Sequence, residues 1–185
     1  MFKNLFDILV LLVMRPRVAW HKINKAAISE ADLRRDYLFP IWGLISLASL
    51  LGAFSHGDLQ YAIKLSAISF VSCFLSYLLA SFALNEVVGY FDLVKDKDRT
   101  RIFVGYASCI VYLLHFINEL QIFSQFFFLG IFQLYTAYVV WDAVGNYYKV
   151  NENKRLWFVG VFTIVLLCAP MAVRWLLGLL MPGIS

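Results

Sequence analysis

The chain has 185 residues, of which 62% are hydrophobic, 17% aromatic and 15% charged. This composition is too apolar for an ordinary soluble domain, so a lipid bilayer is the expected surrounding. The formal net charge of +4 would suggest nucleic acid as a partner in a soluble domain. In a membrane protein, however, Lys and Arg mainly orient the chain, so no nucleic-acid partner is expected.

The N-terminal region, residues 1–36, is predicted to be interfacial and to precede a membrane domain over residues 37–185. As a helix, residues 2–14 would be about 20 Å long, too short to cross a bilayer. A second helix is predicted from Pro16, which suits a first-turn position. Its apolar face comprises Pro16, Ala19, Trp20, Ile23 and Ala27. Its remaining surface carries Arg17, His21, Lys22 and Lys25.

This second helix is typical of a basic amphipathic segment that binds an anionic leaflet. Trp20 would lie at the membrane interface, and each nearby cation would add about 1 kcal/mol of attraction to acidic lipid. The candidate docking residues for lipid or for a partner are Arg15, Arg17, Trp20, Lys22 and Lys25. The same cations also satisfy the simpler need to set membrane topology, and that alternative remains open.

Five later stretches are apolar and long enough to span a bilayer as helices. A capping-box pattern at residues 29–32 predicts the start of the helix that enters the first span, and Pro40 predicts a bend there. The turn between the third and fourth spans is predicted anywhere within residues 118–125. The predicted spans are residues 37–54, 61–88, 102–123, 126–147 and 156–181.

The distribution of cations predicts the topology. Seven Lys and Arg lie in the N-terminal region, four in the loop 92–101 and three in residues 149–155, whereas the other two loops and the C-terminal tail have none. The N-terminus and both basic loops are therefore expected in the cytoplasm and the C-terminus outside, which requires an odd number of spans.

Small and polar residues recur at helical spacing within the predicted spans. Ala48, Gly52, Ser72, Ser76 and Ala80 favour close helix packing, within one protomer or between copies. Polar stripes lie on the third and fourth spans and either line a path or fix the packing. The third-span stripe contains Gly105, Ser108, Tyr112, His115 and Glu119. The fourth-span stripe contains Tyr135, Tyr138, Asp142, Asn146 and Lys149.

Charged residues within the spans are predicted near the membrane faces. Glu86 and Asp142 are placed towards the cytoplasm and Lys64, Glu119 and Arg174 towards the outside, which argues against a charged relay across the membrane. Glu119 could neutralise either Lys64 or Arg174, and Glu86 and Asp142 could meet the basic loops.

No residue pattern indicates catalysis or a bound cofactor. His115 and Glu119 could supply two metal ligands, but no third ligand has a defined spacing. Cys73, Cys109 and Cys168 lie far apart within apolar runs and are expected to be packing residues. The sequence contains no phosphate-binding loop and no nucleophile–base pair of recognisable spacing. We therefore expect no enzyme activity, no cofactor and no metal.

Several short motifs together resemble a known family. The sequence motifs are Pro16, Trp20 and Ile23 near the N-terminus, GYAS and VYLL at 105–108 and 111–114, and Leu134, Tyr135, Tyr138 and Gly145. With five spans and a basic loop after the second, this pattern resembles the Yip family of Ypt/Rab-interacting membrane proteins, specifically its short bacterial branch. The DLYGP element and the long polar tail of eukaryotic members are absent.

The resemblance and the charge pattern together predict an all-α integral membrane protein that acts as a scaffold or adaptor. Its basic N-terminal helix and the loop 95–101 would form one docking surface for anionic lipid or a protein partner. A small transporter or lipid translocator that uses the polar stripes is the alternative function. The expected location is the bacterial cytoplasmic (inner) membrane, or the early secretory pathway in a eukaryote. A homo-oligomer remains open.

Overall fold

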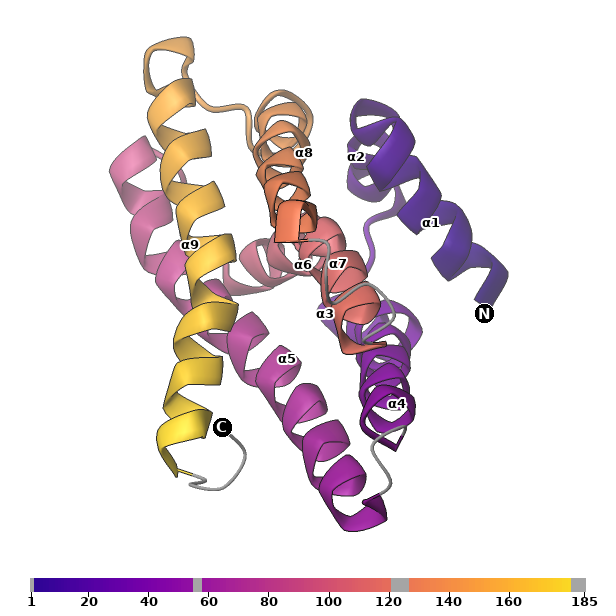
Figure 1. Ribbon diagram of the computed structural model, residues 1–185. Coiled ribbons are helices and arrows are strands. Elements are labelled where there is room, and N and C mark those ends of the chain that lie inside the picture. Colours follow the sequence, from indigo (N-terminus) through magenta and orange to yellow (C-terminus); the bar gives the residue numbers. More distant parts are fainter. Residues whose placement is uncertain (1, 55–57, 121–126, 181–185) are drawn as a thin grey trace.

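The computed structural model describes residues 2–54, 58–120 and 127–180, and its regular secondary structure in these ranges is helical (Figure 1). The N-terminal region forms α1 (Phe2–Met14) and α2 (Pro16–Ala26), as predicted. Pro16 occupies the first turn of α2, and Ala27, which follows the last residue of the helix, is in the left-handed conformation, with φ of 44°. The start of α2 follows from Pro16, whose fixed φ suits the first turn of a helix.

The next helix begins at the predicted cap. The Ser29 hydroxyl accepts a hydrogen bond from the backbone N–H of Asp32 at 3.1 Å and caps α3 (Glu30–Leu33). The π-helical turn η1 (Arg34–Leu38) and α4 (Phe39–Phe54) continue the same helix. This wide turn ends two residues before Pro40, which has no N–H to donate and cannot continue a regular helix without local adjustment.

Three helices are long and apolar enough to cross a membrane: Glu30–Phe54, Leu59–Phe91 and Glu152–Leu180. They contain α4, α5 (Leu59–Val88) with η2 (Gly89–Phe91), and α9 (Glu152–Leu180). The predicted third span is broken into α6 (Lys97–Ala107) and α7 (Cys109–Glu119), which meet at a bend of 45°. The described residues therefore provide three candidate spans, or four if this bent pair forms one span.

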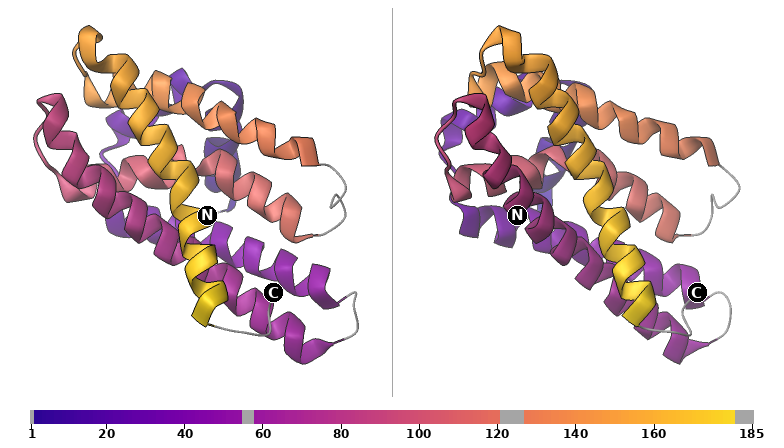
Figure 2. Two further views of the ribbon diagram at one scale, coloured as in Figure 1. Left: turned by 60° about the vertical axis from the view of Figure 1, so that its left-hand side comes forward. Right: turned by 90° about the vertical axis from the view of Figure 1, so that its left-hand side faces the viewer.

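The predicted fourth span corresponds to three consecutive helical segments: η3 (Phe127–Leu134), α8 (Tyr135–Ala143) and η4 (Val144–Tyr148). They lie beside the α6–α7 pair with the opposite chain direction (Figure 2). Residues 121–126, which include most of the predicted turn, lie outside the described residues.

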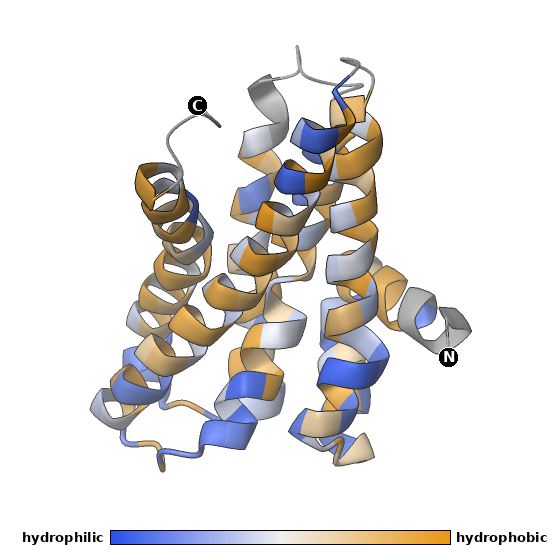
Figure 3. Cartoon of the chain, turned by 90° about the horizontal axis from the view of Figure 1, so that it is seen from below, coloured by the Kyte–Doolittle hydropathy of each residue, from blue (hydrophilic) through white to orange (hydrophobic). Residues whose placement is uncertain are grey.

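The segments that contain the basic loops gather at one end of the bundle. The end of α5, the start of α6, the end of η4 and the start of α9 lie together there (Figure 2). The Lys154 ammonium lies 2.5 Å from the Asp92 carboxylate and ties two of these loops together. We call this the basic end. Hydrophilic residues concentrate here, whereas hydrophobic residues dominate the middle of the long helices (Figure 3).

The small-residue stripe packs α4 against α5 within the chain. Ala48, Ser49 and Gly52 on α4 are buried, as are Ser69 and Cys73 on α5. The Ser69 hydroxyl donates to the Ser49 hydroxyl at 3.2 Å. Small side chains let two helix backbones approach closely in a lipid environment, where hydrophobicity alone does not hold them together.

Aromatic residues mark the two ends of α9. Trp157 and Trp175 are exposed, and the Arg155 guanidinium lies 4.3 Å from the ring centre of Trp141 near the basic end. Indole rings collect where hydrocarbon meets the headgroups, so these residues indicate the membrane boundaries. Cys168, expected to pack, is instead exposed on α9, whereas Cys73 and Cys109 are buried as predicted.

Candidate functional site

The apolar face of α2 packs against α8 and η4. Trp20 is fully buried, its indole Nε1–H donates to the Val139 carbonyl at 2.9 Å, and its ring stacks on Phe103 at 5.3 Å. The prediction that Trp20 lies at the lipid interface or contacts a partner is therefore wrong. The physical reason is that the amphipathic helix α2 packs its apolar face, including Trp20, against the bundle.

Two further contacts fix the N-terminal helices. The Tyr135 hydroxyl donates to the Val13 carbonyl at 2.7 Å, and the Asn24 amide donates to the Asn146 carbonyl at 3.1 Å. These two bonds and the bond of Trp20 are spaced along α8 and η4 towards the basic end. Together they hold α2 in one orientation.

The other four candidate docking residues are exposed. We define them as the α2 docking surface: Arg15, Arg17, Lys22 and Lys25. None has an ion-pair partner within residues 2–54, 58–120 and 127–180. Their charges are therefore available to a partner, with the helix behind them already folded and held.

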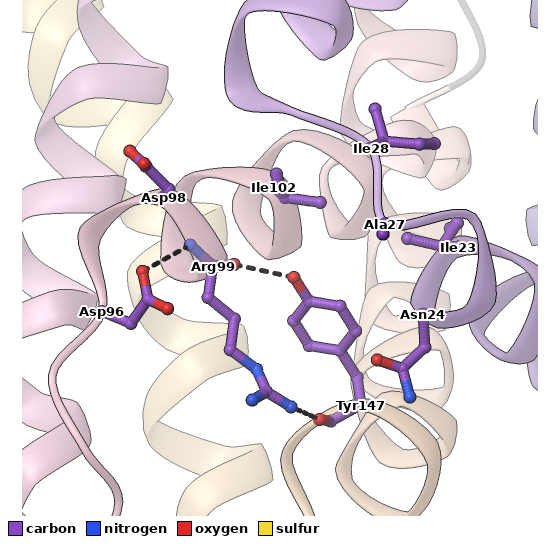
Figure 4. Close-up of a pocket in the computed structure, with 9 residues that line it drawn as sticks. All are labelled: Ile23, Asn24, Ala27, Ile28, Asp96, Asp98, Arg99, Ile102 and Tyr147. Atoms are coloured by element: carbon purple, nitrogen blue, oxygen red, sulfur yellow. Dashed lines mark hydrogen bonds between the residues drawn. The ribbon is translucent and has the colours of Figure 1, made fainter.

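A pocket of about 280 Å³ lies beside this surface, between α2, the start of α6 and η4 (Figure 4). Its α2 side is formed by Ile23 and Asn24, and Ala27 and Ile28 follow. Its far side carries Asp96, Asp98 and Arg99. The pocket therefore has mixed charge, whereas the sequence predicted a basic docking surface.

Arg99 forms part of the pocket wall. Its guanidinium donates to the Tyr147 carbonyl and lies 5.0 Å from the ring centre of Tyr147. The Tyr147 hydroxyl donates back to the Arg99 carbonyl at 3.1 Å. The neighbouring Tyr148 hydroxyl donates to the Thr100 hydroxyl at 3.3 Å.

The predicted single docking surface is divided between two faces of α6. Arg99 lies in the pocket beside α2, whereas Lys97 and Arg101 line a different pocket beside α5. Residues two positions apart lie on nearly opposite sides of a helix, which explains the division. Lys95 is paired with Glu86 at 2.5 Å, and this contact gives the intramembrane candidate Glu86 its partner.

From Tyr112 onwards, the polar stripe of the third span faces α4, α5 and α9. Tyr112 is buried against Trp42, with ring centres 6.3 Å apart. The Glu119 carboxylate is 3.0 Å from His115 Nε2 and 2.5 Å from the Arg174 guanidinium. The predicted Glu119–Arg174 neutralisation therefore exists, away from the basic end. The His115 Nδ1 atom lies 3.5 Å from Cys73 Sγ.

The fourth-span stripe faces the N-terminal helices instead. Tyr135 contacts α1 and Asn146 contacts α2 through the hydrogen bonds given above. Tyr138 is half exposed, and Asp142 is partly buried. The two stripes therefore lie at different helix interfaces, and their described residues do not form a shared polar path. Both stripes contribute hydrogen bonds or packing contacts between helices.

A comparison with protein families finds one match over most of the chain: the Yip1 domain, over residues 10–173. The chain belongs to the Yip family. No curated protein and no solved structure matches the chain. The matched region of the Yip1 domain includes the α2 docking surface, the pocket of Figure 4 and Glu119. Family membership and the apolar helices identify a membrane protein.

The described part of this Yip1 domain holds no group of three or more His, Cys, Asp or Glu side chains placed to bind a metal. Sequence reasoning missed the acidic residues of its pocket. Asp96 accepts a hydrogen bond from the Arg99 backbone N–H at 3.0 Å and caps α6. An Asp directly before the first turn of a helix is a detectable start signal, and here it would have indicated that α6 begins at Lys97.

Proposed function

We propose that this Yip-family protein is a non-enzymatic membrane scaffold that docks a partner through the α2 docking surface. The observation that carries the proposal is the arrangement of α2: one face is fastened to α8 and η4, and the other presents four exposed cations without ion-pair partners in the described part of the chain. A helix that is already ordered loses little conformational entropy when a partner binds.

The buried apolar face favours an acidic protein segment as the docked partner. A helix that binds a bilayer by insertion needs an apolar face directed at lipid, but Trp20 and Ile23 are buried in the protein. Charge attraction remains as the driving force. The adjoining pocket adds Asp96 and Asp98, which fit a partner that carries a hydrogen-bond donor or cation beside its acidic residues.

The proposed membrane arrangement has five spans, with the N-terminus and the basic end in the cytoplasm and the C-terminus outside. The one-sided distribution of Lys and Arg supports it. The α6–α7 pair and the η3–α8–η4 segment would be the third and fourth spans. The proposed location is the bacterial cytoplasmic membrane.

The test compares two quadruple variants of the full chain. One replaces Arg15, Arg17, Lys22 and Lys25 with Gln, and its matched control exchanges Arg for Lys and Lys for Arg at the same positions. A photo-crosslinking amino acid at the exposed His21 captures the neighbour in native membranes. Four exposed ion pairs at about 0.5 kcal/mol each correspond to about a thirtyfold loss of affinity.

The expected result is a specific protein adduct that is lost in the Gln variant, retained in the charge-preserving control and weakened by salt. Equal adduct formation in the Gln variant would contradict the proposed docking surface. Adducts to lipid alone would show that the surface contacts the membrane, and the adaptor role would then be wrong.

A further inference from the structure

A second pocket, of about 170 Å³, lies on the opposite face of α6 from the α2 docking surface. It is formed where α5 approaches the basic end and α6 begins. Its lining combines cations, buried polar side chains and apolar side chains. None of these residues belongs to the pocket of Figure 4, so this second site is independent of the proposed docking function.

Two cations define one side of this pocket. Lys97 and Arg101 lie one helical turn apart on α6 and both line it. Arg101 makes a long ion pair of 3.7 Å with Glu30, whereas Lys97 has no ion-pair partner in residues 2–54, 58–120 and 127–180. Glu86, the carboxylate of this pocket, is already paired with Lys95 at 2.5 Å. The pocket therefore attracts an anion.

Two buried polar atoms define its inner wall. Ser81 is 4% exposed and Asn85 is 7% exposed; the Ser81 hydroxyl and the Asn85 Oδ1 atom have no hydrogen-bond partner among the described residues. Leaving a buried polar group unpaired costs about 1–3 kcal/mol. Asn85 Oδ1 can only accept a hydrogen bond. A phosphodiester group has no O–H to donate to this oxygen, so a diester ligand must also carry a hydroxyl or an ammonium group.

The remaining wall is apolar and faces outward. Leu78 and Phe82 line the pocket, and Phe82 is 70% exposed. Glu86 lies 22 residues after Lys64 on α5, which corresponds to about 33 Å along the helix, close to the thickness of a bilayer. The pocket is therefore located at the membrane boundary, where a lipid presents its phosphate and the start of its acyl chains.

We propose that this pocket binds the headgroup of an anionic glycerophospholipid with a free hydroxyl, of the phosphatidylglycerol type. The phosphate contacts Lys97 and Arg101, a headgroup hydroxyl donates to Asn85 Oδ1, and the acyl chains lie along Leu78 and Phe82. A hydroxyl donor satisfies Asn85 while the lipid keeps the net negative charge that the two cations favour.

The experiment measures lipid binding to the full, delipidated chain by native mass spectrometry. Phosphatidylglycerol and phosphatidylcholine with identical acyl chains are supplied in turn, and thermal unfolding is followed in parallel because a bound ligand raises the unfolding temperature. We expect one phosphatidylglycerol to be retained about tenfold more strongly than phosphatidylcholine, and K97Q/R101Q to abolish this preference. The control K22Q/K25Q removes two cations from the α2 docking surface and should retain the preference for phosphatidylglycerol.

The variant N85L separates binding from folding. Replacing an unpaired buried amide with an apolar side chain of similar size should leave the lipid-free protein equally or more stable while weakening its stabilisation by phosphatidylglycerol. Equal retention of both lipids, or unchanged retention by K97Q/R101Q, would overturn the proposal. Displacement of the lipid by millimolar glycerol 3-phosphate would identify a soluble phosphate ester as the ligand and would also overturn it.

Discussion

The carboxylate of Glu119 lies 2.5 Å from the guanidinium of Arg174 and joins the end of α7 to α9 across 55 positions of sequence. Glu119 is only 4% exposed, whereas the Arg174 side chain is 51% exposed. His115 contacts the same carboxylate from one turn earlier on α7. The broken third helix is thereby attached to the long C-terminal helix at the end of the bundle away from the basic end.

Replacing Glu119 with Gln should destabilise this attachment. Removing one partner of a fully buried ion pair costs about 3–5 kcal/mol, and the exposure of Arg174 reduces the expected loss to about 1–3 kcal/mol. Thermal unfolding in detergent, followed by circular dichroism, measures it. In a double-mutant cycle with R174Q, the second substitution should add little to E119Q. Fully additive losses would show that the two side chains are not coupled.

Substitutions at Trp20 should separate its hydrogen bond from its packing. Trp20→Phe removes the bond to Val139 and should cost about 1 kcal/mol. Trp20→Ala also leaves a cavity and should cost about 3–5 kcal/mol. Hydrogen–deuterium exchange over residues 16–26 should accelerate in the Ala variant and change little in the Phe variant. Unchanged protection of α2 in Trp20→Ala would mean that other contacts are sufficient to hold it.

Gly105 permits the close contact between α6 and α3. A Cβ atom at this position would lie 2.8 Å from Leu33 Cδ2, and Leu33 is itself buried. Gly105→Ala should therefore destabilise the protein by about 1–3 kcal/mol through overpacking. The matched control is Gly160→Ala on α9, where no atom lies within 4 Å of the new Cβ. Equal unfolding temperatures for the two variants would contradict this account.

Labelling of single cysteines tests the five-span arrangement. In a background with Cys73, Cys109 and Cys168 replaced by Ser, the exposed Asn118 near the end of α7 is changed to Cys. An impermeant maleimide applied outside intact cells should label Asn118→Cys and the positive control Asp58→Cys, but not Asp98→Cys. If Asn118→Cys reacts only after the membrane is dissolved, the α6–α7 pair does not reach the outer surface.

Local signals in the sequence predicted the N-terminal helices and the three long helices well. Pro16 and Ser29 mark helix starts through their own backbone and side-chain chemistry, and the apolar runs of α4, α5 and α9 are long enough to be unambiguous. The break at Ser108 had no such signal, because neither Gly nor Pro lies at residues 106–110 and the bend involves residues buried in the tertiary structure.

The candidate site was predicted less completely, and the reason is physical. An apolar helix face has the same pattern whether it covers lipid or protein, so the burial of Trp20 could not be read from its spacing. Arg15, Arg17, Lys22 and Lys25 are exposed, and their role in docking stays a prediction. The pairing of Glu119 with Arg174 depends on contacts between distant helices. Charge and predicted depth in the membrane left two possible partners for Glu119, Lys64 and Arg174.

The two exposed indoles of α9 have a consequence for the lipids that this protein tolerates. Trp157 and Trp175 are 18 residues apart, or about 27 Å along the helix axis, slightly less than the average hydrocarbon thickness. Tilting would shorten this span further and increase the mismatch. A thick bilayer must therefore thin around the protein, whereas a bilayer of short-chain lipids fits it without deformation. We expect acyl-chain length to influence where in a cell's membranes the protein accumulates.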